Sequence, residues 1–287
     1  MATSSPRKST IVRARAVRLL GVLSWIAPSS AAYLASRLWF AIPSPSPASP
    51  GAANGVPFQV SVDGYLVRGA LEGGDGPTVY LVHGWAGDSG QLAPLVGPLV
   101  AAGLRVVAYD GPSHGRSDPG PSGPGRSHAV EFADALAAVA SVHGPARAVV
   151  AHSMGAMASM LALRQGRLSA ERLVFVAPMH DLRSHLDQFA AGLSLGPRAR
   201  RRLDASLEAR VGMRVEDFEL LGMAERVGTP PLLVVHDRND RRLAWAASGE
   251  LVDRWPHARL LTTEGLGHSR LLGDRAVHEE IVRFVSS

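Results

Sequence analysis

Short apolar runs alternate with longer segments of helical periodicity from residue 56 to the end of the chain. Residues 58–62 and 65–70 flank the turn Asp63-Gly64, and this arrangement predicts a β-hairpin. Six further runs are mostly apolar, as is typical of parallel strands buried on both faces. These runs are residues 79–82, 105–109, 146–150, 173–176, 232–235 and 259–261.

The segments between these runs carry apolar residues at the spacing of helices that pack against a sheet. They span residues 91–102, 128–142, 154–164, 243–255 and 277–285. The interval 178–229 contains no strand pattern and is far longer than an ordinary connection. We therefore expect an α/β fold with a mostly parallel central sheet flanked by helices, and a small helical cap inserted at residues 178–229.

The first 50 residues differ in character from the rest of the chain. Five basic residues between Arg7 and Arg18 precede an apolar stretch at 19–35, and the Pro/Ser-rich residues 43–50 follow as a linker. This composition predicts a basic and apolar helical extension with its linker at residues 1–50, followed by a single large domain at residues 51–287.

Three interpretations of the apolar extension stay open. Residues 19–36 carry no charge and approach the minimum length of a membrane span, roughly 18 residues, although Pro28 interrupts their middle. A secretory signal peptide would use the basic residues followed by an apolar core at 19–27. Alternatively, two short helices separated at Pro28 dock on the domain or associate with a membrane surface through residues 11–42. We expect a cytoplasmic protein or one held at a membrane by this segment, and secretion is less favoured.

Composition restricts the chemistry that the chain can carry out. Of its 287 residues, 46% are hydrophobic, which is enough for one well-buried core. The net charge of +5 comes from scattered arginines, apart from the cluster at 198–202, and no nucleic-acid-binding motif accompanies them. The absence of cysteine excludes disulfides, thiolate nucleophiles and Cys-ligated metal sites. Because metal-ligand pairs and nucleotide-binding glycine patterns are also missing, we expect no metal, no cofactor and no nucleic-acid partner.

The candidate nucleophile is Ser153, in the pentapeptide Ala151-His152-Ser153-Met154-Gly155. The pentapeptide follows a strand run and precedes a helical one, which is the position of a G-x-S-x-G nucleophile elbow. Small residues flank the serine there because the sharp turn brings backbone close to it, and Ala151 is a mild departure from glycine. A serine is also a common cap at the start of a helix, so the motif needs support from the rest of the chain.

Two further motifs support it. His83-Gly84-Trp85 ends the first parallel strand, and residues 110–117 (DGPSHGRS) form a turn similar to D-x-x-G-x-G-x-S, with Ser113 where a glycine is common. With the serine after the third parallel strand, residues 56–287 resemble an α/β-hydrolase. The resemblance implies an oxyanion hole made by the backbone N–H groups of Trp85 and Met154, and it assigns no catalytic role to the 110–117 turn.

The acid is selected by chain order, which in this fold is Ser, then Asp or Glu, then His. Residues 236–240 (HDRND) follow the next-to-last strand and resemble the family's G-x-x-D acid loop, which points to Asp240. Asp237 is expected to bond local backbone as a turn residue. Asp181 follows the preceding strand, where some hydrolases carry the acid, but we expect it to cap the first cap helix.

Three of the eleven histidines follow this acid loop. His268 lies in the glycine-flanked loop 265–268 beyond the last strand, where sites of open α/β sheets lie, and it is the candidate general base. His257 precedes that strand, and His278 opens the terminal helix beside two glutamates, where we expect a solvated side chain. Among the earlier histidines, His83 is expected to pack beneath the oxyanion loop and His152 to point away from the serine.

These residues predict a serine hydrolase that cleaves a carboxylic ester, or a related acyl bond, of a small or lipid-like substrate through an acyl-enzyme. Thioesters and amides stay open as substrates. An acyltransferase and a non-catalytic ligand-binding member of the same fold are the alternatives, and the pattern does not indicate an oligomeric state. Six apolar cap residues could line an acyl site, although holding the cap together is the favoured role: Leu182, Leu186, Phe189, Leu193, Leu195 and Leu203.

Overall fold

The structure is a computed structural model that describes residues 6–43 and 55–287. Its chain forms two compact units. The helical unit comprises Met1–Ala41 and Asp181–Phe218, and the sheet unit comprises Ile42–His180 and Glu219–Ser287. Apart from Pro43, the linker expected at 43–50 lies outside the described residues.

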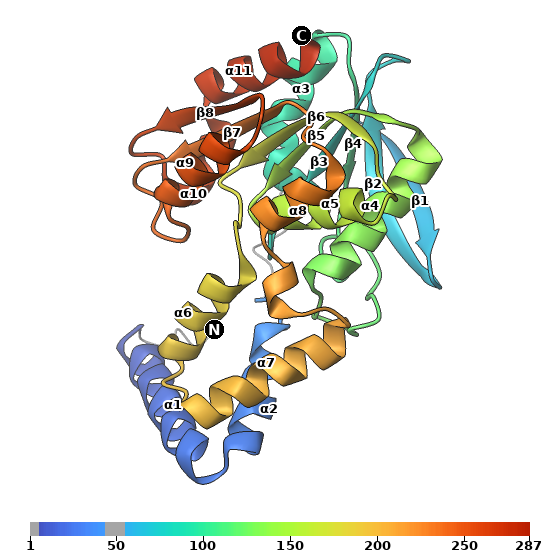
Figure 1. Ribbon diagram of the computed structural model, residues 1–287. Coiled ribbons are helices and arrows are strands. Elements are labelled where there is room, and N and C mark those ends of the chain that lie inside the picture. Colours follow the sequence, from blue (N-terminus) through green and yellow to red (C-terminus); the bar gives the residue numbers. More distant parts are fainter. Residues whose placement is uncertain (1–5, 44–54) are drawn as a thin grey trace. The chain divides into compact units, whose positions relative to one another are not determined.

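An eight-stranded sheet of order β1-β2-β4-β3-β5-β6-β7-β8 forms the centre of the sheet unit (Figure 1). Strands β1 and β2 form the expected antiparallel hairpin, β2 pairs antiparallel with β4, and all other pairs are parallel. The expected α/β fold with a mostly parallel sheet is therefore confirmed. The strands are β1 (Val56–Val62), β2 (Tyr65–Glu72), β3 (Thr78–Val82), β4 (Arg105–Tyr109), β5 (Ala146–His152), β6 (Ala170–Val176), β7 (Leu232–Asp237) and β8 (Ala258–Thr263).

Helices flank this sheet at nearly all the segments where the periodicity predicts them. Successive residues of a strand point to opposite faces, so a strand buried on both faces must be apolar at every position. Every residue of strand β3 is buried, and all of them except Thr78, at its start, are hydrophobic. The helices are η1 (Ser89–Leu92), α3 (Ala93–Ala101), α4 (Ala129–His143), α5 (Met154–Arg164), α8 (Leu220–Val227), α9 (Trp245–Arg254), α10 (Gly267–Arg270), η3 (Leu271–Gly273) and α11 (Arg275–Ser286).

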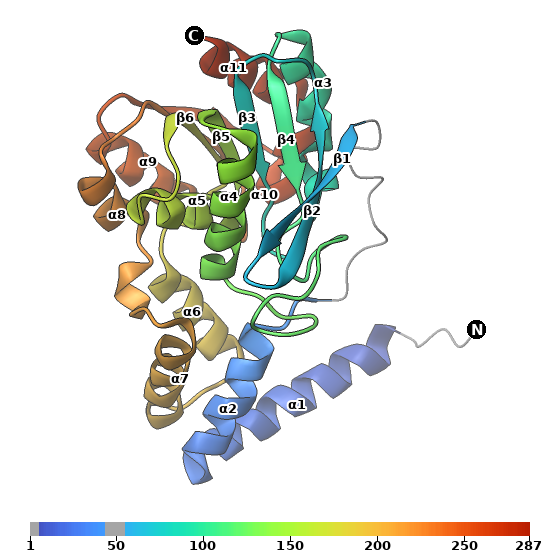
Figure 2. The same cartoon turned by 90° about the vertical axis from the view of Figure 1, so that its right-hand side faces the viewer.

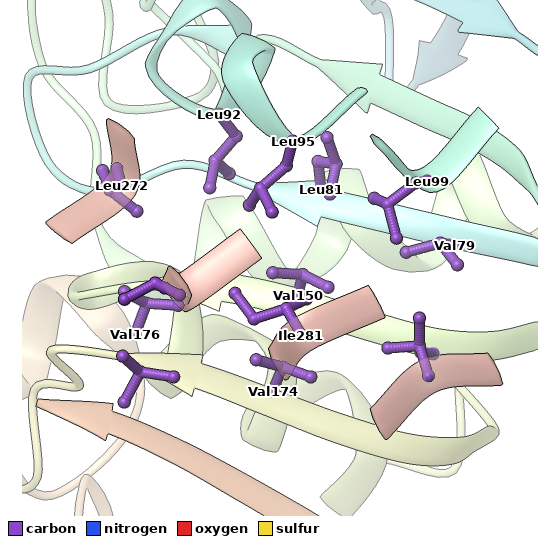
Figure 3. Close-up of a cluster of buried hydrophobic side chains, with 14 of the residues drawn as sticks. Val79, Leu81, Leu92, Leu95, Leu99, Val150, Val174, Val176, Leu272 and Ile281 are labelled. Atoms are coloured by element: carbon purple, nitrogen blue, oxygen red, sulfur yellow. The ribbon is translucent and has the colours of Figure 1, made fainter. Parts of the chain in front are cut away.

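A large apolar cluster lies between one face of the sheet and helices α3 and α11 (Figure 3). Val79 and Leu81 of β3 and Val150 of β5 contribute from the sheet, and Leu99 of α3 and Ile281 of α11 contribute from the helices. All five side chains are at most 1% exposed. This packing fixes the carboxyl ends of the central strands, where the candidate site residues lie.

The helical unit combines two segments that are far apart in the sequence. Its N-terminal part forms α1 (Pro6–Ile26) and α2 (Pro28–Trp39), which meet at an angle in Figure 2. Its later part forms α6 (Leu182–Gly192), α7 (Pro197–Val211) and η2 (Val215–Asp217). Of the interval in which a cap was expected, α8 belongs instead to the sheet unit.

A second apolar cluster holds the helical unit together. Ala32 and Ala35 of α2 pack with Leu203 and Leu207 of α7 and with Leu186 of α6. Proline at the first position of α2 suits its fixed backbone, and the small alanines let the helices approach closely. The six apolar cap residues named above all contact this cluster, so packing accounts for them.

No helix among residues 6–43 and 55–287 has both the length and the apolar character needed to cross a membrane.

Truncation of the buried Leu99 should lower the stability of the sheet unit. We expect Leu99→Ala to reduce the free energy of unfolding by about 2–5 kcal/mol, because it removes apolar contacts and leaves a cavity. Urea denaturation followed by circular dichroism measures the change. The matched control is Val142→Ala on α4, where the side chain is 62% exposed and the expected change is within about 0.5 kcal/mol. Equal effects of the two substitutions would contradict the packing described here.

Candidate active site

Ser153 lies between the end of β5 and the start of α5, with φ 52° and ψ −116°. L-residues other than glycine rarely adopt this conformation, so the surrounding contacts must impose it. The Ser153 N–H donates to the carbonyl of Val176 (3.0 Å), and its carbonyl accepts from the amides of Ala156 and Met179 (both 3.1 Å). These bonds turn the chain sharply from the strand into the helix.

Close packing explains the small residues of the elbow. A Cβ atom on Gly155 would lie 2.6 Å from the carbonyl oxygen of Val82, so the start of α5 packs directly on the end of β3. A Cβ on Gly84 would lie 2.8 Å from Nδ1 of His152. Ala151 instead sits inside β5, fully buried and paired with β3 and β6, where a methyl group fits.

The loop after β3 leaves one amide available for an oxyanion. Gly84 N–H donates to Oε1 of Gln91 (2.9 Å), and Ala86 N–H donates to Nε2 of His114 (3.2 Å). Between them, the amide of Trp85 has no hydrogen-bond acceptor among the described residues. Met154 is the first residue of α5, where an N–H has no partner within the helix. Both amides predicted from the family motif are thus free to bind an anionic oxygen.

Two buried histidines hold this loop. His83 donates from Nδ1 to the carbonyl of Gly84 (2.8 Å) and accepts at Nε2 from Gly111 N–H (2.8 Å). His114 contacts the carbonyl of Pro112 through Nδ1 (2.9 Å) while Nε2 accepts from Ala86. Burial lowers the pKa of His83 and lowers that of His114 to about 3. Both rings are therefore neutral, with one donor and one acceptor nitrogen each, as these contacts require.

Asp240 and His268 meet through a short contact between Oδ2 and Nδ1 (2.7 Å). Both side chains are buried, and the other carboxylate oxygen, Oδ1, accepts from the amides of Arg242 (2.7 Å) and Leu243 (3.2 Å). Burial alone would raise the pKa of Asp240, but hydrogen bonds from His236 and His268 outweigh it and hold the pKa well below its usual range. The carboxylate is therefore ionised and can orient the imidazole.

The competing acids have other roles. Asp237 accepts hydrogen bonds from Thr263 Oγ1 (2.7 Å) and from the amides of Asn239 and Leu266 (both 2.9 Å). It thereby ties the acid loop to the loop that carries the candidate base, and its expected role as a turn residue is confirmed. Asp181 begins α6 and accepts from the amide of Ser184 (2.6 Å), as expected of a helix cap.

One expectation about the histidines is wrong. His278 lies on the buried face of α11 rather than in solvent. Its Nε2 lies 2.7 Å from the carbonyl oxygen of Leu272. Its position beside two glutamates suggested exposure, but His278 belongs to the buried face of α11, together with Val277 and Ile281. Tertiary packing of that face decided its environment.

His152 has a role that sequence reasoning missed. Its Nδ1 lies 3.0 Å from Oε1 of Gln91, and its Nε2 lies 3.1 Å from the carbonyl oxygen of His268. The rings of His152 and His268 are 4.8 Å apart. Burial lowers the pKa of His152 to about 3. This neutral side chain thus lies between the loop after β3 and the backbone of the candidate base, and no local pattern signals partners so far away in sequence.

A cluster of three or more His, Asp or Glu side chains that could hold a metal ion does not occur in the described part of the chain.

Comparison with known proteins identifies the family. The family model described as serine aminopeptidase, S33, matches residues 76–219. The pimeloyl-[acyl-carrier protein] methyl ester esterase of Xanthomonas campestris pv. campestris is 30% identical, over 75% of this chain and 97% of the relative. The chain belongs to the α/β-hydrolase family. It is a serine hydrolase of the carboxylesterase type, an enzyme that hydrolyses ester bonds.

Solved structures show the same fold. Est1E from Butyrivibrio proteoclasticus, solved with ferulic acid, has a TM-score of 0.59 and 20% identity, covering 80% of this hydrolase and 96% of Est1E. A bacterial membrane phospholipase A has a TM-score of 0.63 and 15% identity. The match covers 98% of this hydrolase and 99% of the phospholipase.

Acid should destabilise this hydrolase through its buried neutral histidines. His114 and His152 have folded pKa values of about 3, against 6.5 for an unperturbed histidine. Between those limits the unfolded chain binds protons that the folded chain excludes, so stability falls as the pH drops below about 6.5. Each residue contributes up to about 1.4 kcal/mol per pH unit, and neither contributes above that range. Urea denaturation between about pH 7.5 and about pH 4 measures the slope.

The control for this prediction compares two histidine variants. His114→Asn should reduce the pH slope, since it removes one titrating group, whereas His257→Asn, at an exposed position, should leave the slope unchanged. A wild-type stability that is the same at about pH 5 as at about pH 7 would contradict the prediction.

Proposed function

We propose that this hydrolase cleaves a carboxylic ester of a small or lipid-like substrate through a triad of Ser153, His268 and Asp240. The observation that carries the proposal is the 2.7 Å contact between His268 Nδ1 and the buried Asp240 carboxylate. Because an ionised carboxylate only accepts hydrogen bonds, Nδ1 must carry the proton, and Nε2 of the neutral ring keeps its lone pair. That lone pair is the group a general base needs to activate Ser153.

The proposed reaction proceeds through an acyl-enzyme. Ser153 Oγ attacks the ester carbonyl while His268 Nε2 accepts its proton, and Asp240 stabilises the imidazolium that forms. The amides of Trp85 and Met154 donate to the oxyanion of the tetrahedral intermediate. His268 then protonates the leaving alcohol, and water, activated by the same imidazole, releases the carboxylic acid. Neutral His83 and His114 support this chemistry by keeping the loop of Trp85 in place before substrate binds.

The relatives favour an ester over an amide. The curated relative is named for the hydrolysis of a methyl ester on a pimeloyl group carried by an acyl-carrier protein. We extend to this chain only the class of bond, a carboxylic ester of an aliphatic acyl group, and leave the acyl chain length to experiment.

Substitution of the triad should abolish or strongly reduce ester hydrolysis. We expect Ser153→Ala to remove turnover of nitrophenyl esters, and Asp240→Asn to lower kcat about 10⁴-fold because the amide favours the wrong histidine tautomer. Ser141→Ala, an exposed serine on α4, is the control and should keep wild-type rates. Near-normal rates in either triad variant would refute the assignment.

Labelling with a fluorophosphonate, located by mass spectrometry, tests the nucleophile directly. Modification at Ser153, absent in Ser153→Ala, is the expected result. A panel of nitrophenyl esters of increasing chain length then identifies the preferred acyl group. Failure of the folded wild-type protein to react, together with tight binding of an acyl ligand, would replace the hydrolase by a ligand-binding function. A rate that rises with added alcohol would indicate acyl transfer.

We also infer that the helical unit associates with an anionic membrane surface. Leu19, Val22 and Ile26 of α1 are 71%, 61% and 76% exposed, and their spacing places them along one face of the helix. Arg15 and Arg18, also exposed, precede Leu19 and Val22 by four residues and share that face. On α2, Tyr33, Leu34 and Leu38 are exposed as well.

The charge of α1 and α2 suits an anionic surface rather than a protein partner of mixed charge. No acidic residue precedes Asp63 in the chain. Interfacial helices of this kind bury an apolar face at the boundary between headgroups and acyl chains while arginines contact the lipid phosphates. A hydrolase at such a surface would meet lipid-like esters where they are concentrated.

Vesicle sedimentation measures this association. Binding is expected to vesicles that contain phosphatidylglycerol and to weaken in high salt or on phosphatidylcholine alone. Replacing Arg15 and Arg18 with Gln should weaken binding roughly 30-fold, at about 1 kcal/mol for each arginine near the surface. Val142→Gln, an exposed apolar residue of the sheet unit, is the control and should bind like wild type. Equal sedimentation with and without vesicles would refute the association.

A further inference from the structure

The proposed acid contacts a second histidine. His236, at the end of β7, is fully buried, and its Nε2 lies 3.1 Å from Oδ2 of Asp240. This is the same oxygen that contacts Nδ1 of His268 at 2.7 Å. One carboxylate oxygen therefore lies between two imidazoles, and the other is held by the backbone amides of its own loop.

The contacts continue beyond His236 to two more side chains. Its Nδ1 lies 2.7 Å from Oγ of Ser248, a fully buried residue of α9. The same hydroxyl lies 3.0 Å from Nε2 of His180, which follows β6. The ring of His180 stacks on that of His236, with 6.1 Å between centroids and 11° between planes. Three side chains, His180, His236 and Ser248, thus connect the loop after β6, strand β7 and helix α9 to the carboxylate.

When all three rings are neutral, matching each donor to an acceptor determines which nitrogen atoms carry the protons. The ionised carboxylate of Asp240 cannot donate, so His236 Nε2 must carry a proton just as His268 Nδ1 does. In neutral His236 the Nδ1 atom is then an acceptor, which the hydroxyl of Ser248 satisfies as a donor. The Ser248 oxygen in turn accepts from Nε2–H of His180. Every group in the series has a partner of the right kind, and only one arrangement of protons achieves this with all three histidines neutral.

The geometry points to His236 as a positioning residue for the triad, a role that rests on the function proposed above. By donating to Oδ2, His236 fixes the rotation of the Asp240 carboxylate and so the direction of the lone pair that meets His268. His268 is then held in the Nδ1–H tautomer with Nε2 as the base. His236 touches no reacting atom and acts only through Asp240, and Ser248 and His180 hold it in the tautomer that this role requires.

A donor to the carboxylate also has an electrostatic consequence. During the reaction His268 becomes an imidazolium, and a neutral His236 adds no like charge on the other side of Asp240. The groups that face His236 are Asp240 from its own loop, His268 from the loop after β8, His180 from the loop after β6, and Ser248 from α9. The Ser248 hydroxyl lies against Nδ1, on the side of the ring opposite the carboxylate.

Kinetics of His236 variants test this role. His236→Met keeps a buried side chain of similar length but removes the donor. We expect kcat to fall about 10–100-fold, by analogy with the loss of an outer hydrogen-bond partner of a metal-ligating histidine. KM should change less than about twofold, since His236 does not contact substrate. His236→Gln, whose amide N–H can reach Asp240, should recover most of the lost kcat. A merely structural role would not be restored by a flexible amide.

A double-mutant cycle separates action through Asp240 from action elsewhere. If His236 works through the carboxylate, His236→Met should cause no further loss of kcat in an Asp240→Asn background. Additive losses, or wild-type kcat in His236→Met, would overturn the inference. If His236→Met fails to fold, as judged by its thermal melt, Ser248→Ala serves instead. That variant removes only the hydroxyl that holds His236, and kcat should fall by about tenfold or less with KM retained.

Fluorophosphonate labelling of the wild type distinguishes failure of this inference from failure of the proposed function. Absence of labelling at Ser153 in the wild type would remove the triad itself. Labelling at Ser153 together with unchanged kcat in both His236→Met and Ser248→Ala would leave the triad in place and overturn only the positioning role.

Discussion

The disfavoured backbone conformation of Ser153 is the constraint on which the rest of the site depends. It can persist only because the ends of β3 and β5 pack so closely that Gly84 and Gly155 have no room for a side chain. This contact holds Ser153, the proposed nucleophile, and the amides of Trp85 and Met154 in one arrangement before any substrate binds. Such preorganisation costs nothing at the moment of reaction, which is why strain of this kind is found at catalytic sites.

Several histidines of the site are buried. The hydrogen-bond partner of each ring determines whether its nitrogen atoms donate or accept. His83 and His114 use one acceptor nitrogen each to hold backbone amides, so they must stay neutral, and burial keeps them so. His236 and His268 instead face an ionised carboxylate and must present a proton to it. His152 lies between these two groups of contacts. The same side chain thus serves as acceptor or donor according to what the fold places opposite it.

In the helical unit, α1 and α2 have one face that is packed and another that is exposed. One face of α1 and α2 packs with α7, where Leu20, Ala31 and Ala199 form a small buried cluster. Ser24 joins the two segments as well, because its hydroxyl accepts from the amide of Gly196 (2.9 Å). The other face keeps large apolar side chains and arginines exposed, a combination that water alone does not favour.

Local sequence patterns determined the strands, most helices and the chain order of the proposed triad. Apolar runs predict buried strands, and small residues around Ser153 predict an elbow once the other motifs support it, so these features follow from patterns along the chain. The partners of His152 and His236 and the burial of His278 depended instead on packing between distant elements. The pattern of residues 19–40 was compatible with a span, a signal or, as the favoured interpretation, two docked or surface-associated helices. An apolar segment indicates that it must be covered, but the sequence does not indicate what covers it. Only the tertiary structure showed what covers it. Residues of α6 and α7, among them Leu203, pack against α2.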